Sequence, residues 1–215
     1  MNDAPPTTPR ADPVRPLMRS GGANGSDSEW AECAAREGFP VHQIVFEGHP
    51  AAGRTNHKVA TRAELDAVRP VLARVARRVN KKVPRPGSYA YDLLARNALV
   101  VAGAHAVYAV GTRSTPATPG ALGVDGGTGW ACELYVEQCE HPNLFLFDQS
   151  AHVNAWFVWL DGLWMRCKAP MWPGAIPVRS TWVGIGSRDV TAQGRQAIVA
   201  CVRRPERPTP GTPNE

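Results

Sequence analysis

The sequence predicts an α/β domain with a Rossmann-like, doubly wound parallel sheet. Segments rich in β-branched and aromatic residues alternate with segments of helical periodicity along most of the chain. The expected strands are almost continuously apolar, as in HAVYAVGT at 105–112, which is typical of parallel strands covered by helices on both faces. Three of the strands end in glycine-rich loops that directly precede expected helices.

The individual elements follow from the apolar patterns and the turn signals between them. Strands are expected at residues 14–19, 41–48, 105–112, 143–149 and 181–186. Helices are expected at residues 26–37, 61–79, 89–101 and 128–138, with a last helix after Thr191.

Several residues mark where these helices begin and end. Gly38 is expected to cap the C-terminus of the first helix, and Thr191 the N-terminus of the last. Thr61 and Glu64 form a T-x-x-E capping box. Pro70 lies inside the second helix and should kink or split it, because proline lacks the N–H that a helix interior needs.

Residues 150–180 interrupt the alternation with a tryptophan-rich insert before the last strand. The segment WFVWLDGLWMRC is typical of a β-hairpin with Asp161-Gly162 at its turn. The tryptophans fit either a surface on which a ligand stacks or a small hydrophobic satellite of the core. They are Trp156, Trp159, Trp164 and Trp172, with Trp182 just past the end.

Length and composition predict one domain in a reducing compartment. The 215 residues fit a single domain at 14–204 between two tails, 1–13 and 205–215, whose proline-rich composition predicts disorder. No stretch approaches the ~18 consecutive apolar residues of a membrane span, and the first residues lack the apolar core of a secretory signal. The five cysteines form no CxxC pair, which is typical of reduced thiols. We therefore expect a cytoplasmic protein that contacts no membrane.

Positive charge is concentrated in one part of the chain. The net charge is +5, and residues 62–85 contain eight Lys or Arg residues opposed by Glu64 and Asp66. Such a run can bind the phosphate backbone of a nucleic acid, but it is more often the solvated face of an amphipathic helix. Nucleic-acid binding is therefore the lesser alternative.

The glycine-rich strand ends predict a site for a phosphate-bearing, nucleotide-type ligand. A helix N-terminus offers unpaired N–H groups, and glycine lets a phosphate approach the backbone. One such loop also fits a simple tight turn, but in a doubly wound sheet the three would converge on one crevice. The predicted ligand-binding residues are Ser20, Gly21, Gly22, Ala23, Gly25, Asp27, Asp125, Gly126, Gly127, Thr128, Gly129, Gly184, Gly186, Ser187 and Arg188.

Four segments resemble a known superfamily. GGTGWACE at 126–133 resembles the G-G-x-G-T-x-x-E motif of the Lonely Guy phosphoribohydrolases, which activate cytokinins. LLARNALVVAGAHAVYAVG at 93–111 is similar to the arginine-containing helix and the following strand of that family. RSGGANGSD and VGIGSRD resemble further loops of the wider SLOG superfamily, which includes the DprA/Smf proteins. Together the segments span most of residues 15–204 except the insert.

The order of these segments differs from the order usual in that superfamily. There the G-x-G-S strand comes first, whereas VGIGSRD comes last here. The resemblance therefore implies a circularly permuted SLOG-type domain, which is tolerated where chain ends are close and exposed. The crevice is then expected beside Gly186 and Asp125, where the strand order reverses. The implied order in the sheet is 41–47, 15–20, 181–186, 105–111 and 143–147.

The resemblance also implies that Arg96 and Glu133 are catalytic residues. In the phosphoribohydrolases these positions act on a nucleoside monophosphate as its N-glycosidic bond is hydrolysed. A carboxylate can stabilise positive charge on the ribose or activate water, and an arginine can hold the phosphate or orient the carboxylate. Without the resemblance, Glu133 would be interpreted as a solvated helix residue and Arg96 as part of a structural ion pair.

Two residues depart from the family motif. Trp130 replaces its threonine, and Asp125 replaces the proline before its glycines. A carboxylate at Asp125 would repel a phosphate unless it met a ribose hydroxyl, a base edge or a metal, so the cytokinin substrate is not carried over. Asp27 fits either a helix cap or a contact with a sugar hydroxyl. Ser187 and Arg188 occupy the place where the superfamily's first loop meets phosphate.

Three functions are consistent with these residues. The first is a hydrolase of an N-glycosidic bond, the second a nucleotide sensor or carrier without turnover, and the third a DprA-like protein that binds single-stranded nucleic acid. The resemblance to the phosphoribohydrolases also suggests a homodimer. The six histidines show no metal-binding spacing, so neither a metal site nor a cofactor is predicted. His49 and His57 lie in a loop that could close over the crevice.

Overall fold

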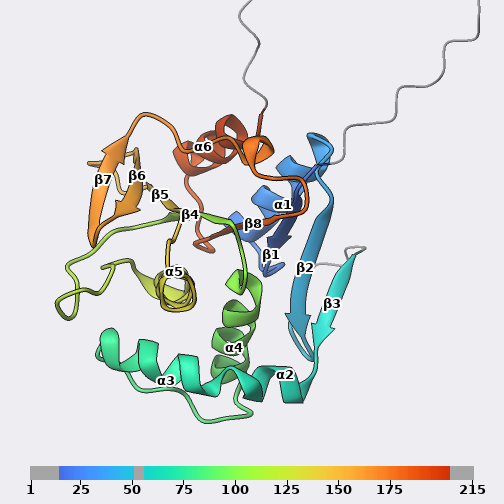
Figure 1. Ribbon diagram of the computed structural model, residues 1–215, viewed down its shortest axis with the longest axis vertical. Coiled ribbons are helices and arrows are strands. Elements are labelled where there is room, and N and C mark those ends of the chain that lie inside the picture. The colour runs from blue at the N-terminus through green and yellow to red at the C-terminus, as the bar shows by residue number, and fades with distance from the viewer. Residues whose placement is uncertain (1–14, 51–55, 204–215) are drawn as a thin grey trace, which may run out of the picture.

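The chain folds around a single β-sheet (Figure 1). The structure is a computed structural model that describes residues 15–50 and 56–203. The predicted tails at 1–13 and 205–215 lie outside the described residues. The described strands are β1 (Leu17–Ser20), β2 (Val41–Phe46), β3 (His57–Ala60), β4 (Ala106–Gly111), β5 (Leu144–Asp148), β6 (Ala155–Leu160), β7 (Leu163–Cys167) and β8 (Thr181–Gly186).

The strand order confirms the arrangement predicted for the centre of the sheet. The full order is β3-β2-β1-β8-β4-β5-β6-β7. Its middle five strands, from β2 to β5, are parallel and occur in the predicted sequence. Consequently β8, the last strand of the described chain, lies between β1 and β4 in the interior of the sheet.

Both edges of the sheet differ from the prediction. β3 adds a parallel strand beside β2, where only a loop was expected. At the other edge β6 pairs antiparallel with β5, and β7 antiparallel with β6, so the sheet is mixed rather than wholly parallel. The physical reason is the short connection from β5 to β6, because a parallel partner would need a long crossover. The predicted hairpin turn at Asp161-Gly162 is confirmed, with both residues at positive φ.

Helices cover both faces of the sheet, as the almost continuously apolar strands predicted (Figure 1). α1 (Ser26–Arg36) and α6 (Ala192–Val202) lie on one face, with the short 3₁₀ helix η1 (Pro173–Ala175) beside α6. The opposite face carries α2 (Arg62–Ala67), α3 (Arg69–Arg78), α4 (Tyr89–Val101) and α5 (Gly126–Gln138). Each helical layer packs on its own hydrophobic cluster.

Most of the predicted helix boundaries are confirmed. Thr61 and Glu64 form the capping box that starts α2, and the Thr191 side chain caps α6. The helix predicted at 61–79 is split before Pro70, which lies in the first turn of α3, where its missing N–H costs no hydrogen bond. α5 begins at Gly126, two residues earlier than expected, so Gly126 and Gly127 belong to the helix.

The tryptophan-rich insert is an integral part of the sheet, which contradicts the interpretation as a satellite cluster. Trp156 and Trp159 lie three residues apart on β6, so their side chains point to opposite faces. Trp156 joins the cluster under α1 and α6, whereas Trp159 joins the cluster under α2 to α5. The insert therefore extends both cores toward the β7 edge.

Candidate functional site

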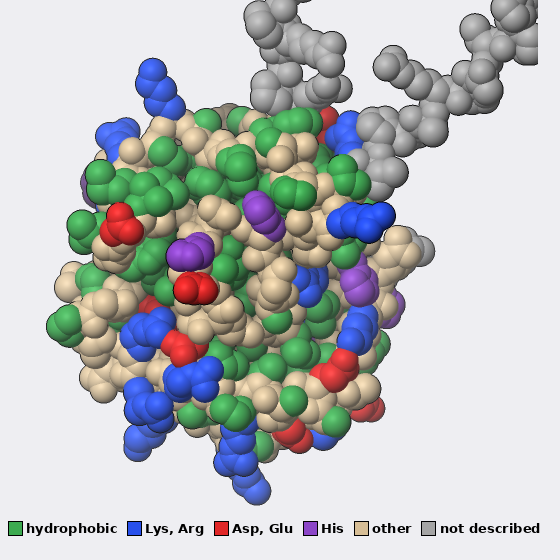
Figure 2. Space-filling view, in the orientation of Figure 1, with side chains coloured by type: hydrophobic (Ala, Val, Ile, Leu, Met, Phe, Trp, Pro, Cys, Tyr) green, Lys and Arg blue, Asp and Glu red, His purple; other side chains and the backbone are tan. Residues whose placement is uncertain are grey.

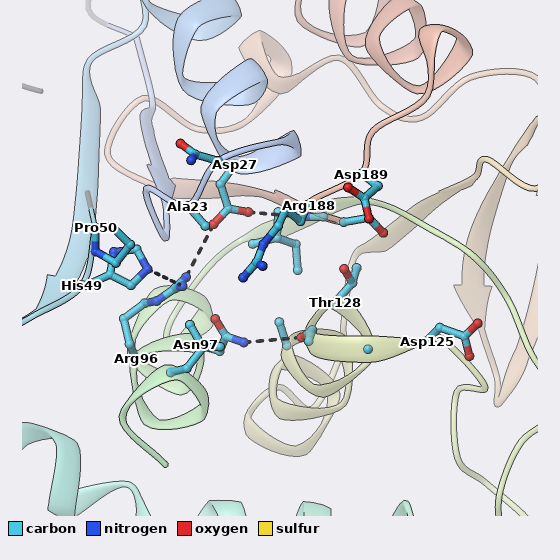
Figure 3. Close-up of a pocket in the computed structure, with 18 of the residues that line it drawn as sticks. Ala23, Asp27, His49, Pro50, Arg96, Asn97, Asp125, Thr128, Arg188 and Asp189 are labelled. Carbon is cyan, nitrogen blue, oxygen red and sulfur yellow. Dashed lines mark hydrogen bonds and ion pairs between the residues drawn. The ribbon is translucent and has the colours of Figure 1, made fainter. Parts of the chain in front are cut away.

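A cavity of about 620 Å³ lies at the carboxyl ends of the central strands, where the strand order reverses on either side of β8. Its walls come from the loop between β1 and α1, the end of β2, the helix α4, the start of α5, and the loop between β8 and α6 (Figure 3). Open α/β sheets bind their ligands at this position, so the cavity is the candidate site.

The fold brings many of the sequence-predicted site residues together in this cavity. The predicted residues that line it are Ala23, Asp27, Arg96, Asp125, Gly126, Gly127, Thr128, Gly186, Ser187 and Arg188. The predicted residues that do not line it are Ser20, Gly21, Gly22, Gly25, Gly129, Glu133 and Gly184. Sequence reasoning did not select Asn24, Tyr89 and Asn97, which also line it. Asn97 directly follows Arg96 in the segment that resembles the family, and this adjacency could have indicated that Asn97 is also a site residue.

Arg96 is a buried guanidinium in the cavity wall with few partners. It projects from α4 and is only 2% exposed. Its NH1 lies 3.5 Å from Oδ2 of Asp27, and its NH2 lies 3.5 Å from Nε2 of His49 (Figure 3). Nε has no hydrogen-bond partner among the described residues. Burial lowers the pKa of Arg96 and Asp27 opposes this, but an arginine keeps its proton in proteins.

Asp27 is the buried carboxylate of the cavity. It is 5% exposed, and its Oδ1 accepts a hydrogen bond from the N–H of Gly186 at 3.2 Å. Burial raises the pKa of Asp27, while the charge of Arg96 and the backbone N–H groups of Ala23 and Gly186 oppose the rise. The proposed capping role is wrong, because the N-cap of α1 is Gly25 and no side chain caps that helix.

Gly21 explains how Asp27 and Arg96 fit against the backbone. A Cβ atom added at Gly21 would lie 1.4 Å from NH1 of Arg96 and 2.6 Å from Oδ2 of Asp27. The space above Gly21 is thus occupied by the pair itself. Gly21 does not line the cavity, but it makes room for the two side chains that do.

His49 lies on the other side of Arg96 and is neutral at physiological pH. Burial, and next the charge of Arg96, lower its pKa to about 4. Its Nδ1 is buried and has no partner among the described residues. Its ring packs edge-on against Phe46, which also contacts the ring of Tyr89. This end of the cavity is therefore aromatic and carries an uncharged imidazole. The companion residue His57 lies in the exposed strand β3 instead.

The opposite end of the cavity is the N-terminus of α5. Asp125 occupies the N-cap position, but its side chain makes no capping hydrogen bond. The first turn of the helix therefore presents N–H groups without a side-chain acceptor, together with the positive end of the helix dipole. A Cβ added at Gly127 would meet nothing within 4 Å, so this glycine faces open space. The Thr128 side chain adds a hydroxyl, and Asp125 points away from Arg96 (Figure 3).

The remaining predicted glycines act in packing rather than in the cavity wall. A Cβ at Gly184 would lie 2.4 Å from Cγ of Trp30, and one at Gly129 would lie 1.9 Å from the carbonyl oxygen of Val124. A Cβ at Gly25 would lie 2.2 Å from the carbonyl oxygen of Arg188. Close packing at these three positions explains why they are glycines, without a contact to a ligand.

Glu133 faces away from the cavity. It lies on α5 with only 2% exposure, and its Oε1 accepts a 2.6 Å hydrogen bond from the N–H of Leu122. Its Oε2 lies 3.4 Å from NH1 of Arg78 on α3. Burial raises the pKa of Glu133, and Leu122 and Arg78 oppose that rise. The carboxylate thus ties α5 to α3 and to the loop at Leu122.

Glu133→Ala is expected to lower the free energy of unfolding by about 3 kcal/mol, because it leaves the buried N–H of Leu122 without its acceptor and removes one of the two carboxylates that pair with Arg78. Urea unfolding of the variant and the wild type measures this difference. The exposed Glu140 near the end of the same helix supplies the control, and Glu140→Ala should change stability by less than about 0.5 kcal/mol. A Glu133→Ala protein as stable as the wild type would contradict the structural role.

The basic run of the sequence is partly neutralised on α3. Lys and Arg side chains gather there, with Asp and Glu side chains among them (Figure 2). Arg74 and Arg78 both pair with Glu137 on α5, and Arg78 also reaches Glu133. Arg77, Lys81 and Lys82 remain exposed. This surface therefore combines salt-bridged and exposed cations, and nucleic-acid binding there stays a prediction.

The described residues show no metal-binding group of three or more His, Cys, Asp or Glu side chains. Within the same residues, no helix is both long enough and apolar enough to cross a membrane. All five cysteines are free thiols.

Comparison with known proteins does not assign the chain to a family. No protein-family model, curated protein or solved structure matches it.

Proposed function

We propose that this chain binds a nucleotide-type ligand in the cavity and hydrolyses its N-glycosidic bond. The observation that carries the proposal is Arg96, a buried cation in the wall of an open cavity. Both of its polar contacts are 3.5 Å long, and its Nε lacks a partner among the described residues. Burying such a charge is costly unless it is paired, so its unused donors favour a ligand rich in oxygen acceptors, as a nucleotide is.

The phosphate of this ligand would bind at the start of α5 and at the loop between β8 and α6. The N–H groups of the first turn of α5 suit an oxyanion, and Gly127 leaves the approach open. Ser187 and Arg188 add a hydroxyl and a cation on the same cavity wall. The departure from the family motif at Asp125 is compatible with this arrangement, because that side chain is exposed and water screens its charge.

The base would bind at the aromatic end of the cavity. Tyr89 lines the cavity and is 50% exposed, so one side of its ring is free for stacking. His49 lines the same region and provides a hydrogen-bonding group for a base edge, whereas Asn97 donates a hydrogen bond to the carbonyl oxygen of Gly127 at the start of α5. A nucleotide extended from α5 to Tyr89 would therefore meet charged, polar and aromatic groups in the order of its own phosphate, sugar and base.

The proposed reaction type rests on the resemblance of the chain to a circularly permuted SLOG-type domain. Support comes from β8, which is the last strand of the described chain yet lies next to β1 in the sheet. Both ends of the described chain also leave the same side of the molecule (Figure 1), as a permuted chain requires. The resemblance implies an N-glycosidic hydrolase, with a nucleotide sensor that lacks turnover as the alternative.

Arg96→Gln is expected to weaken nucleoside monophosphate binding about 100-fold, which corresponds to about 2.7 kcal/mol, because it removes the buried cation. Isothermal titration calorimetry with the four common ribonucleoside monophosphates, their nucleosides and inorganic phosphate measures the effect. The matched control is Arg195→Gln, since Arg195 pairs with Glu29 and does not line the cavity. Equal weakening by both variants, or no binding to the wild type, would overturn the proposal.

A further inference from the structure

We propose that Asp27 is the carboxylate that acts on the sugar of the bound nucleotide, in the role that the family motif gives to Glu133. This inference rests on the proposed function, because it concerns the same cavity and the same bond. The inference assigns the role to Asp27 on α1 instead of Glu133 on α5, because of these two side chains only that of Asp27 lines the cavity.

Only one of the carboxylates that line the cavity is buried. The cavity is lined by Asp27, Asp125 and Asp189, of which Asp125 and Asp189 are exposed and Asp27 is 5% exposed. Water screens an exposed carboxylate more strongly than a buried one, so a buried carboxylate interacts more strongly with a neighbouring sugar. Asp27 therefore has the environment that stabilising a cationic ribose requires.

Asp27 lines the cavity and its contacts leave it capacity for a ligand, whereas Glu133 does not line the cavity. Asp27 contacts the N–H of Gly186 at 3.2 Å, Arg96 at 3.5 Å and the backbone N–H of Ala23, and the first two distances are long for hydrogen bonds. Glu133 accepts a short 2.6 Å bond from Leu122 and pairs with Arg78 outside the cavity. A carboxylate oxygen can accept two hydrogen bonds, so Asp27 retains acceptor sites toward the cavity.

Asp27 is also positioned between the two expected ends of the ligand. Through Gly186 it is tied to the loop that carries Ser187 and Arg188, where the phosphate is proposed to bind. Through Arg96 it is connected to His49 at the aromatic end (Figure 3). The sugar of a nucleotide that spans the cavity would therefore lie beside Asp27.

The proposed step consumes one water molecule. The water oxygen forms a bond to C1′ of the ribose as the bond from C1′ to the base nitrogen breaks, and the electron pair of that bond remains on the nitrogen. Asp27 accepts a proton from the attacking water, and the departing base takes a proton from solvent. Asp27 then returns its proton to solvent, so the products are the free base and the ribose phosphate. Burial favours this role, because it raises the pKa of Asp27 and makes the carboxylate a stronger base.

The experiment measures kcat from the release of free base and Kd by calorimetry, using the nucleoside monophosphate that binds the wild type best. Asp27→Asn is expected to lower kcat at least about 100-fold, while Kd changes less than it does in Arg96→Gln, because the amide keeps the shape and the Arg96 cation is retained. Glu133→Gln, the matched control, should keep kcat within about threefold of the wild type. Circular dichroism and thermal unfolding establish that both variants are folded.

A second measurement tests the inference if Asp27→Asn does not fold. In both the wild type and His49→Gln, which removes the other titratable group beside Arg96, the pH profile of kcat should require a single unprotonated group whose pKa lies above the ordinary value for aspartate, about 3.9. An acidic limb at or below that ordinary value would overturn the assignment.

The remaining outcomes separate this inference from the proposed function. Loss of kcat in Glu133→Gln but not in Asp27→Asn would overturn the assignment to Asp27. A rise in Kd without a fall in kcat for Asp27→Asn would make Asp27 a positioning residue for Arg96, and would also overturn it. Tight binding of an intact nucleotide with no free base would overturn the catalytic role while nucleotide binding stands. Absence of any nucleotide binding would overturn both.

Discussion

Trp30→Ala is expected to lower the free energy of unfolding by about 4 kcal/mol, a large part of the ~5–15 kcal/mol that stabilises an average domain. Trp30 on α1 is fully buried. Its ring centroid lies 6.0 Å from that of Tyr108 and 6.1 Å from that of Trp182. Its Nε1 donates a 3.1 Å hydrogen bond to the carbonyl oxygen of Ile185 on β8.

The cost is high because Trp30 has no alternative packing. The backbone of Gly184 lies directly under its ring, where a Cβ would come within 2.4 Å of Cγ. Removing the indole therefore leaves a cavity between α1 and β8 that neither element can close without moving the other. Since α1 also carries Asp27, the functional cavity would lose its shape together with the core.

Urea unfolding followed by circular dichroism measures this effect. Trp164→Ala is the matched control, because Trp164 lies in the edge strand β7, is only partly buried, and also donates a hydrogen bond to a backbone carbonyl, that of Leu122. We expect Trp164→Ala to cost about 2 kcal/mol, roughly half as much. Equal losses for the two variants would contradict the central role of Trp30.

The sequence predicted the centre of the fold well because burial leaves a strong pattern there. β4 is buried along its whole length, and β8 almost so, and both appear as uninterrupted apolar runs. The capping box at Thr61 and Glu64 located the start of α2 from local chemistry alone. The order of the five central strands came from the resemblance to the SLOG superfamily, since apolar patterns do not specify which strands are neighbours.

The edges of the sheet could not be predicted in the same way. β3 has the sequence HKVA and is mostly exposed, so it lacks the apolar pattern of a central strand. For β6 the pattern was strong, but it did not indicate whether Trp156 and Trp159 packed on the main cores or on each other. That depends on pairing with β5, which is a tertiary contact.

The candidate site was predicted in outline but not in its chemistry. The motifs brought Arg96 and the start of α5 to one cavity. They also selected Glu133, because a motif gives spacing along a helix and not the direction in which each side chain points. The packing of α3 against α5 turns the Glu133 carboxylate toward Arg78. The burial of Asp27 beside Arg96 likewise depends on residues far apart in the sequence.

Gly21→Ala is expected to weaken nucleotide binding on the order of 1000-fold, about 4 kcal/mol, while the protein still folds. The added methyl would lie 1.4 Å from NH1 and 2.4 Å from Cζ of Arg96. Gly21 does not have a positive φ, so alanine introduces no backbone strain at this position. The clash is with the end of a long side chain, which can swing away into the cavity at a cost of about 1–3 kcal/mol. The displaced guanidinium would then occupy the space meant for the ligand and would leave Asp27 without its cation.

Calorimetric titration with the best-binding nucleoside monophosphate measures the loss, and thermal unfolding measures stability. Gly127→Ala provides the contrast, because a Cβ there would meet nothing within 4 Å and alanine favours the helical conformation. We expect Gly127→Ala to be at least as stable as the wild type. Any loss of nucleotide affinity in this variant would indicate that the ligand lies against the start of α5, where the added methyl group would meet it. A Gly21→Ala protein with wild-type affinity would mean that the Asp27 and Arg96 pair does not contact the ligand. The glycine of the first loop would then be only a packing residue, and the phosphate would have to be held at α5 and the Arg188 loop alone.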